Sequence, residues 1–367
     1  MNIDARAEAW VRLHAAGVPA RALVALLRAF GSPEAVLDAH PAQRAPHVTA
    51  AAAEVLATPP STERIDAALA WLEHPAHAFV AWDDPDYPAL LLETADPPPL
   101  LFTIGDRSLL ARPGLAIVGS RNATPQGCSD AEAFAAALAA AGLAIVSGLA
   151  LGIDAAAHRG ALCASGATIA VIGTGPDRVY PARNRALAHE IAERGLVLSE
   201  FGPGTPPLPG NFPRRNRVIS GLARGVLVVE ATVSSGSLIT ARMAGEQGRE
   251  LFAIPGSIHS PFSRGCHKLI RDGAKLVETA EHILEELRLP APNVSTHTAT
   301  QSRTERSHAG HPDEDAVLAA IGSDLVDVDT ISTRTRLPTR RILACLTTLE
   351  LEGRIAPVAG ARWQRLA

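Results

Sequence analysis

The stretch from Phe212 to Ala241, FPRRNRVISGLARGVLVVEATVSSGSLITA, predicts two helix starts on either side of one buried strand. Gly225–Glu230 is an almost continuous apolar run, which is typical of a strand covered on both faces. Pro213 suits the first position of a helix, so three arginines fall in that helix's first turn: Arg214, Arg215 and Arg217. Cations there oppose the helix dipole, which makes sense if an anion binds at that end.

A Gly/Ser turn follows the strand and opens a second predicted helix, Leu238–Gln247. Open α/β sheets bind ligands at the carboxyl ends of their strands, which is where such a turn lies. No aspartate or glutamate occurs between Glu200 and Glu230, so little negative charge competes with a bound anion. The two helix starts therefore predict a phosphate or polyphosphate ligand, held in part by the turn residues Ser235, Gly236 and Ser237.

Length and composition limit the classes of protein to which this chain can belong. The chain has 367 residues, which favours two or three domains, and a formal charge of -4, so any basic surface must be local. The four cysteines lie far apart without a C-x-x-C motif, which argues against a zinc site or a disulfide framework. No signal-peptide pattern or membrane-spanning apolar run is evident. We therefore expect a cytoplasmic protein with no metal site and no membrane span.

The domain organisation follows from the apolar periodicity. Residues 1–75 predict an N-terminal domain of short helices. From residue 76 to 289, short apolar runs alternate with helix-length amphipathic stretches, a rhythm typical of βαβ units. This predicts an α/β fold with a doubly wound, mostly parallel sheet, whose strands are Phe79–Trp82, Leu100–Ile104, Leu115–Gly119, Leu143–Ser147, Thr168–Ile172, Leu196–Glu200, Gly225–Glu230 and Leu251–Ile254.

The last part of the chain predicts a second, smaller domain. Residues 290–312 are polar and without periodicity, which indicates a flexible linker. Residues 313–367 predict three helices and a hairpin around Gly360, which is a winged-helix pattern. Its third helix begins with Arg340 and Arg341, candidates for secondary DNA contacts. Many winged helices contact proteins instead, and acidic residues dilute the charge of this one, so both partners stay open.

Three more strand ends carry glycine-containing turns. Gly119 lets the backbone approach a ligand closely, Ser120 offers a hydroxyl, and Arg121 can fork onto a phosphate. The spacing is not G-x-G-x-x-G and no acidic residue follows at the next strand end, which disfavours a dinucleotide cofactor. Gly173–Gly175 is a further such turn. The remaining turn has backbone N–H groups that can cradle a phosphate and contains Ser147, Gly148 and Ala150.

A few other polar or aromatic residues have two interpretations each. Asp154 and His158 share one helix face and form either a catalytic or metal pair or, as we favour, a hydrogen-bonded pair that fixes the helix to the sheet. Glu200 is the one carboxylate placed at a strand end for general-base chemistry, and it has no evident partner. Phe212 is either a loop anchor or a platform for a nucleic-acid base, and the residues alone favour neither.

Taken in order, these segments resemble the DNA-processing protein A (DprA, also Smf) family from about Ala78 to Leu287: IVGSR, SGLALGIDAAAHRGAL, VIGTG, SEFGPG, FPRRNRVI, VLVVEA, SGSLITA and AIPG. The flanks resemble that family's SAM-like N-terminal and winged-helix C-terminal domains. The resemblance implies an extended Rossmann fold that binds single-stranded DNA and forms a homodimer. It also implies loading of the recombinase RecA onto incoming DNA during natural transformation, by a protein without catalytic activity or cofactor.

The resemblance also implies which residues meet DNA. They are Gly119, Ser120, Arg121, Phe212, the arginines from Arg214, and Ser235, Gly236 and Ser237. Relatives often have a basic residue shortly before the equivalent of Phe212, where this chain reads Leu208-Pro209-Gly210-Asn211. Arg214 or Arg215 is the candidate substitute.

A hydrolase is the alternative function. The family's sheet resembles that of nucleotide phosphoribohydrolases, which carry the motif P-G-G-x-G-T-x-x-E. The corresponding segment here, SSGSLITA, lacks the glutamate. The sequence therefore favours a non-enzymatic DNA-binding protein over a hydrolase.

Overall fold

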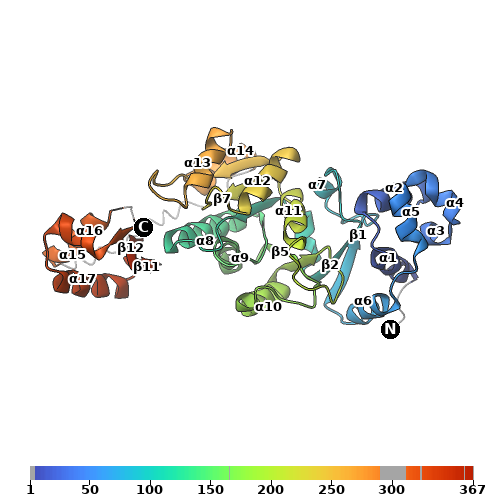
Figure 1. Ribbon diagram of the computed structural model, residues 1–367, viewed down its shortest axis with the longest axis horizontal. Coiled ribbons are helices and arrows are strands. Elements are labelled where there is room, and N and C mark those ends of the chain that lie inside the picture. The colour runs from blue at the N-terminus through green and yellow to red at the C-terminus, as the bar shows by residue number, and fades with distance from the viewer. Residues whose placement is uncertain (1–4, 165, 290–310, 323–324, 359, 367) are drawn as a thin grey trace.

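The computed structural model describes residues 5–164, 166–289, 311–322, 325–358 and 360–366. Within these residues, a nine-stranded sheet in the order β1-β2-β6-β5-β4-β3-β7-β8-β9 forms the centre of the molecule (Figure 1). The strands β6-β5-β4-β3-β7-β8-β9 all run parallel to one another. At one edge, β2 pairs antiparallel with β6, and β1 pairs antiparallel with β2. Their bounds are β1 His77–Ala81, β2 Leu100–Gly105, β3 Gly114–Val118, β4 Ala144–Ser147, β5 Thr168–Ile172, β6 Leu196–Ser199, β7 Gly225–Val228, β8 Glu250–Ala253 and β9 Lys275–Leu276.

Helices cover both faces of the sheet, which confirms the predicted doubly wound α/β fold. In β3, Ala116 and Val118 pack into one hydrophobic cluster with residues of α11 and α12, whereas Leu115 and Ile117 pack into another with α8, α9 and α14. The helices of this part of the chain, on the two faces together, are α7 Ala89–Leu92, α8 Pro125–Ala140, α9 Ile153–Ala164, α10 Arg185–Arg194, α11 Asn211–Gly221, α12 Ser237–Glu246, α13 Arg264–Arg271 and α14 Ala280–Glu286.

The strand order reverses at β3, which lies in the middle of the sheet. The chain adds β4, β5 and β6 on one side of β3, then returns and adds β7, β8 and β9 on the other side. Val118 of β3 pairs with Val228 of β7, so these two strands end side by side. Crevices at such a switch point, outside the carboxyl ends of the strands, are the usual ligand sites of open α/β sheets.

The N-terminal helices pack against the antiparallel edge of the sheet. Their hydrophobic core contains Trp10 and Leu26 together with Leu100 and Phe102 of β2, so the helical part and the sheet share one core. The ring of His14 adds a hydrogen bond from Nε2 to the backbone oxygen of Glu200, at 2.9 Å. The helices are α1 Ala5–Ala15, α2 Ala20–Phe30, α3 Pro33–Asp38, α4 Pro41–Arg44, α5 Ala50–Ala57 and α6 Thr62–Leu72.

The C-terminal part has a hydrophobic core of its own, formed by residues such as Val317, Leu346 and Ile355. Three helices pack against a small sheet in the order β10-β12-β11, which confirms the predicted winged helix. Its elements are α15 Pro312–Ile321, β10 Val326–Asp327, α16 Val328–Thr335, α17 Thr339–Leu351, β11 Ile355–Val358 and β12 Arg362–Arg365. The predicted linker, residues 290–312, lies almost entirely outside the described residues.

Candidate nucleic-acid interface

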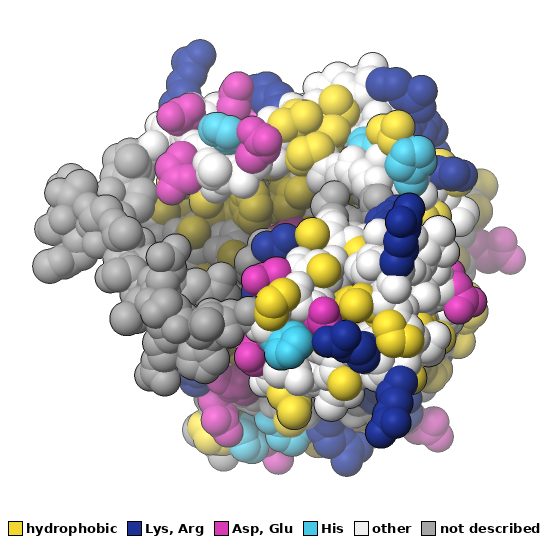
Figure 2. All heavy atoms as spheres, turned by 90° about the vertical axis from the view of Figure 1, so that its left-hand side faces the viewer, with side chains coloured by type: hydrophobic (Ala, Val, Ile, Leu, Met, Phe, Trp, Pro, Cys, Tyr) yellow, Lys and Arg dark blue, Asp and Glu magenta, His cyan; other side chains and the backbone are white. Residues whose placement is uncertain are grey.

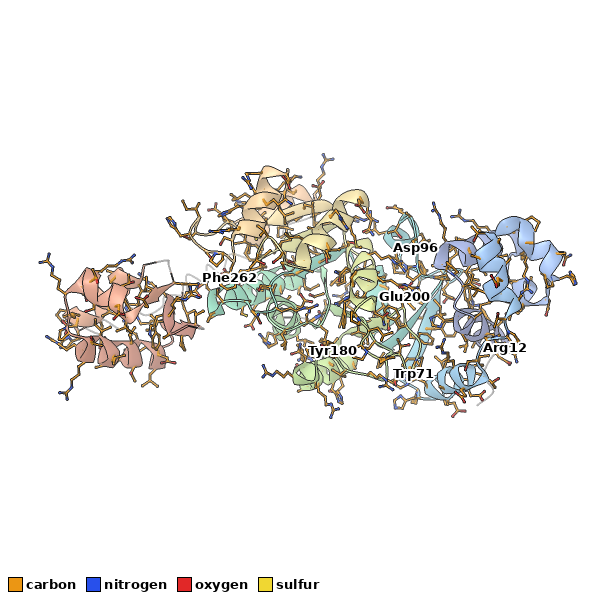
Figure 3. The ribbon with its side chains drawn as sticks, viewed as in Figure 1. Arg12, Trp71, Asp96, Tyr180, Glu200 and Phe262 are labelled. Atoms are coloured by element: carbon orange, nitrogen blue, oxygen red, sulfur yellow. The ribbon has the colours of Figure 1, made fainter. Side chains whose placement is uncertain are left out.

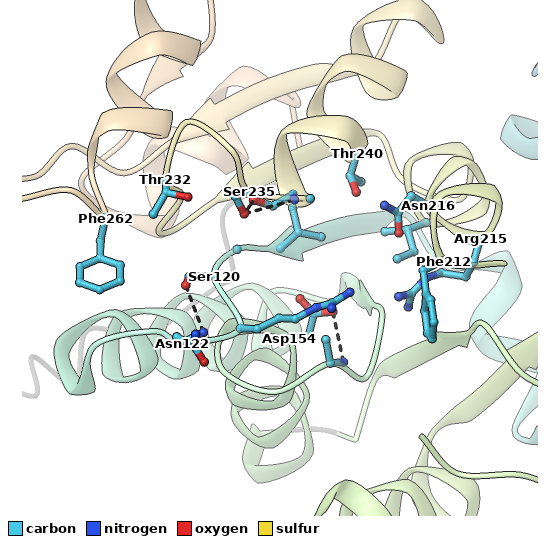
Figure 4. Close-up of a pocket in the computed structure, with 17 residues that line it drawn as sticks. Ser120, Asn122, Asp154, Phe212, Arg215, Asn216, Thr232, Ser235, Thr240 and Phe262 are labelled. Atoms are coloured by element: carbon cyan, nitrogen blue, oxygen red, sulfur yellow. Dashed lines mark hydrogen bonds between the residues drawn. The ribbon is translucent and has the colours of Figure 1, made fainter. Parts of the chain in front are cut away.

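A groove of about 360 Å³ lies at the carboxyl ends of β3 and β7 (Figure 4). We call it the switch-point groove. It brings together predicted site residues from four separate segments of the chain: Gly119, Ser120, Arg121, Ala150, Phe212, Arg215, Ser235, Gly236 and Ser237. It is also lined by residues that the sequence analysis does not single out as ligand contacts: Asn122, Asn216, Thr232, Thr240 and Phe262.

The turn after β3 is held rigidly against the start of α9. A Cβ atom on Gly119 would lie 2.6 Å from Ile153 Cγ1, so only glycine fits at this position. The backbone N–H of Ile153 donates to the oxygen of Ser120 at 3.2 Å. Gly152 has a φ of +73° and its Cβ would lie 2.3 Å from the same oxygen, which again requires glycine. These contacts fix the backbone from which Arg121 projects.

Arg121 is the exposed cation of the switch-point groove. Its guanidinium carbon lies 5.9 Å from the centroid of the Phe212 ring. Among the described residues it takes part in no ion pair. A guanidinium on an aromatic surface without a carboxylate partner is suited to binding a phosphate or stacking on a base.

Arg215 has a structural role beneath the groove that it also lines, and its contact with DNA stays a prediction. Only 5% of the residue is exposed. Its Nη1 donates to the backbone oxygens of Gly148 and Val171, at 2.5 and 2.6 Å. The Asp154 carboxylate beside it accepts from the N–H groups of Gly148 and Ala150. Burial lowers the pKa of Arg215 to about 10 while Asp154 opposes this shift, so the side chain stays charged at neutral pH beneath the groove.

Arg214 and Arg217 point away from the switch-point groove. Helix α11 begins at Asn211, two residues before the predicted start, so Arg214 is the one arginine of the three in its first turn. Arg217 is 13% exposed and donates to Glu200 Oε1 and to the backbone oxygen of Asp96. Arg214 also pairs with Glu200 Oε1, at 3.0 Å. Glu200 therefore has two cationic partners, contrary to expectation, and lies between α11 and the N-terminal helices (Figure 3).

The turn after β4 contributes less to the groove than predicted. Ser147 is fully buried, and its hydroxyl donates to the oxygen of Ile117 at 2.6 Å. Gly148 is covered by Arg215, whose Nη1 would lie 2.0 Å from a Cβ at that position. Neither residue can touch a ligand in this arrangement, so both are corrected to supporting residues. Ala150 does line the groove.

Phe212 belongs to the first turn of α11 and is partly exposed. A Cβ on Gly173 would lie 3.0 Å from its ring, so the glycine of the turn after β5 makes room for the ring. The ring of Tyr180 lies 5.5 Å away, at 42° to it. The aromatic side chain is thus anchored on one side by Gly173 and approached by Arg121 in the groove.

The N-terminus of α12 forms the opposite wall. Its N-cap residue is Gly236, which provides no side chain to bind the first N–H groups of the helix. The hydroxyls of Ser235 and Ser237 are 2.7 Å apart and can both turn toward a bound oxygen anion. A helix start lined by hydroxyls suits an anion, as the sequence predicts. That these serines bind DNA stays a prediction.

Asp154 and His158 do not bond to each other in the described hydrogen bonds, so the predicted pair is corrected. His158 Nδ1 instead bonds to the hydroxyl of Thr168 in β5, at 2.7 Å. Burial lowers the pKa of His158 to about 3, which keeps the ring neutral. Asp154 thus ties α9 to the turn after β4, and His158 ties it to β5. Among the described residues, no group of three or more His, Cys, Asp and Glu side chains could hold a metal ion.

In the winged helix, Arg340 and Arg341 lie exposed in the first turn of α17. Arg341 pairs with Asp313, which leaves Arg340 as the better candidate for a nucleic-acid contact. The end of the molecule seen in Figure 2 carries basic, acidic and histidine side chains interspersed. None of the helices in the described part of the chain is long and apolar enough to cross a membrane.

Comparison with known proteins agrees with this geometry. Residues 78–288, more than half of the chain, match the sequence model of the family described as DNA recombination-mediator protein A. The chain belongs to the DprA family. Residues 300–361 also match the DprA winged helix domain.

Related DprA proteins cover most of the chain. Protein Smf of Escherichia coli is 44% identical over 303 residues, which are 81% of this chain and 79% of the relative. A crystal structure of DprA from Streptococcus pneumoniae superposes with a TM-score of 0.68 and 41% identity, covering 78% of this chain and 99% of that one. DprA from Helicobacter pylori, whose structure concerns its single-stranded DNA binding mode, gives a TM-score of 0.53 and 32% identity over 59% of this chain and 97% of that one.

Proposed function

We propose that this protein binds single-stranded DNA in the switch-point groove. The observation that carries the proposal is Arg121, whose backbone is held in place and whose guanidinium lies beside the Phe212 ring without an ion-pair partner among the described residues. Phosphate and base recognition are the two requirements of a single-strand site, and this pair of side chains offers both. The structure of the Helicobacter pylori relative, which concerns single-stranded DNA binding, supports the proposal.

The groove does not suit hydrolysis. Asp154 is the one carboxylate that lines it in the described structure, and its Oδ2 already accepts from two backbone N–H groups beside Arg215. Glu200 lies in a different cavity, between two arginines. Neither carboxylate is placed to activate water in the groove. We therefore propose a binding protein without catalytic activity, and incubation with AMP should release no free base.

The proposed role of the protein is to load a recombinase onto the bound strand. The family resemblance leads us to propose that the protein acts in the cytoplasm as a homodimer and loads RecA onto single strands taken up during transformation. A measurement of RecA filament formation on strands precoated with single-strand-binding protein tests this. The protein should shorten the lag before filament growth, and an unchanged lag would contradict the loading role.

Titrations with single- and double-stranded oligonucleotides across a salt series test DNA binding itself. The chain has no net positive charge, so duplex affinity should be low, while stacking makes single strands the better ligand. Single-strand affinity should fall with a log–log salt slope of about -0.7 for each phosphate contact. Equal affinity for duplex and single strand at moderate salt would contradict the proposal.

A further inference from the structure

Two phenylalanines stand outside the hydrophobic cores. All eight phenylalanines of the chain lie in described segments, and six are buried or pack against a core cluster: Phe30, Phe79, Phe102, Phe134, Phe201 and Phe252. The other two, Phe212 and Phe262, are partly exposed, and both line the switch-point groove. Aromatic rings that are partly open to water in the same groove present an apolar face that a ligand can contact.

The backbone of Phe262 is fixed to Ala231, three residues beyond the end of β7. Its oxygen accepts from the N–H of Ala231 at 2.8 Å, and its own N–H donates to the hydroxyl of Ser260 at 3.3 Å. The N–H of Gly265 donates to the oxygen of Ala231 at 2.7 Å, so both polar groups of that backbone unit hold this loop. A Cβ on Gly265 would lie 2.6 Å from the same oxygen, so glycine permits the approach. Phe262 is therefore presented from a rigid support.

The two rings lie at opposite ends of the groove. Figure 4 shows Phe262 projecting from its loop near Ser120, whereas Phe212 projects from α11 at the other end. Ser235, at the N-terminus of α12, lies between them in this view, and the guanidinium of Arg121 lies 5.9 Å from the Phe212 ring. The groove thus has an aromatic ring at each end and, along its walls, groups suited to phosphate.

We propose that Phe262 is a second base-stacking platform of this site. A single strand then lies along the groove with one base against Phe212, another against Phe262, and the intervening backbone at Arg121. This inference rests on the proposed binding of single-stranded DNA. Because every base has a π-face, two stacking positions hold a strand without selecting its sequence.

The full-length protein and a fluorescent thymidine oligonucleotide provide the test. Phe262→Ala should weaken binding about 5- to 100-fold, the range that corresponds to loss of one stacked base. Phe262→Leu should weaken it similarly, because leucine keeps apolar contact but has no ring, whereas Phe262→Trp should retain affinity. The matched control is Ile258→Ala, in the same loop at 75% exposure and outside the groove lining, which should change affinity less than about twofold.

A second arm separates base stacking from other effects. With an oligonucleotide of the same length whose bases are replaced by abasic sites, Phe262→Ala and the wild type should bind equally. Wild-type affinity in Phe262→Ala, or an equal loss on both oligonucleotides, would overturn the inference. If Arg121→Ala loses binding while Phe262→Ala does not, the proposed function stands without the second platform. If the wild type binds no single strand, the proposed function itself fails.

Discussion

Replacing Arg215 by methionine is expected to destabilise the fold. Methionine has a similar length but no charge, so the substitution leaves the backbone oxygens of Gly148 and Val171 without their donor and Asp154 without its cation. Asp154 is only 7% exposed, so water replaces the lost partner poorly. No direct hydrogen bond joins the two side chains in the described structure, but they interact electrostatically, and leaving a buried charge without its counter-charge costs about 3–5 kcal/mol. For a domain of about 200 residues this lowers the melting temperature by about 6–20 °C.

Thermal and urea denaturation measure this change, and a double variant isolates its cause. Asp154→Asn keeps an oxygen that can accept from the N–H groups of Gly148 and Ala150, but it removes the charge. In the Arg215→Met/Asp154→Asn variant, the carboxylate that Arg215→Met leaves without its cation is removed as well. We therefore expect its free energy of unfolding to exceed that of Arg215→Met alone, and the two losses to be non-additive.

One specific outcome would contradict the structural role of Arg215. If Arg215→Met melts within about 2 °C of the wild type but binds single-stranded DNA tenfold more weakly, the guanidinium reaches the DNA. The hydrogen bonds to Gly148 and Val171 would then not be its main role. Restored stability without restored binding in the double variant would lead to the same conclusion.

Three further predictions concern the groove, a buried histidine and the C-terminal part. Arg121→Ala should lower single-strand affinity about 10- to 100-fold at an unchanged melting temperature, because a charged hydrogen bond contributes about 1.5–3 kcal/mol. An unchanged affinity in titration would show that the strand binds elsewhere. The pKa of His158 is about 3 in the fold against 6.5 for the free side chain, so its contribution to stability is complete above pH 6.5 and is lost as the pH falls toward 3. Urea denaturation of His158→Leu should show a shallower loss in that range, by up to about 1.4 kcal/mol per pH unit, and an equal slope would show that the ring is not kept neutral. A chain ending at Leu289 should bind single strands within about threefold of the full chain, since every groove residue precedes it, and a larger loss in the same titration would assign part of the site to the winged helix.

Much of the fold can be predicted from local sequence patterns. Apolar runs such as Gly225–Glu230 have no polar face, so their strands must be covered on both sides, and this requires a doubly wound sheet. Glycine and serine at strand ends mark the turns, because parallel strands end at one edge of the sheet and their turns meet there. Gly119, Arg121 and Ser235 could therefore be assigned to one site although they are far apart in the chain.

The directions of the three arginines depend on tertiary structure. Arg214 and Arg217 lie three residues apart on one side of α11, and Arg215 lies on the side that faces the sheet. The sequence shows the cluster, but the start of the helix and its packing decide the rotation, and a shift of one residue turns a side chain by about 100°. The acceptors of Arg217 at Asp96 and Glu200 come from distant segments.

Phe262 is a groove residue that the sequence could not identify. It lies in an irregular loop without helix or strand periodicity, so no local pattern distinguishes it from a core phenylalanine. Its place in the groove results from hydrogen bonds between that loop and Ala231, which follows β7 and lies more than thirty residues earlier in the chain. The sequence alone determined the sheet, its turns and the general place of the site, because these depend on local periodicity and on strand direction. The tertiary structure decided which side chains reach the groove, because that depends on contacts between segments that are distant in the chain.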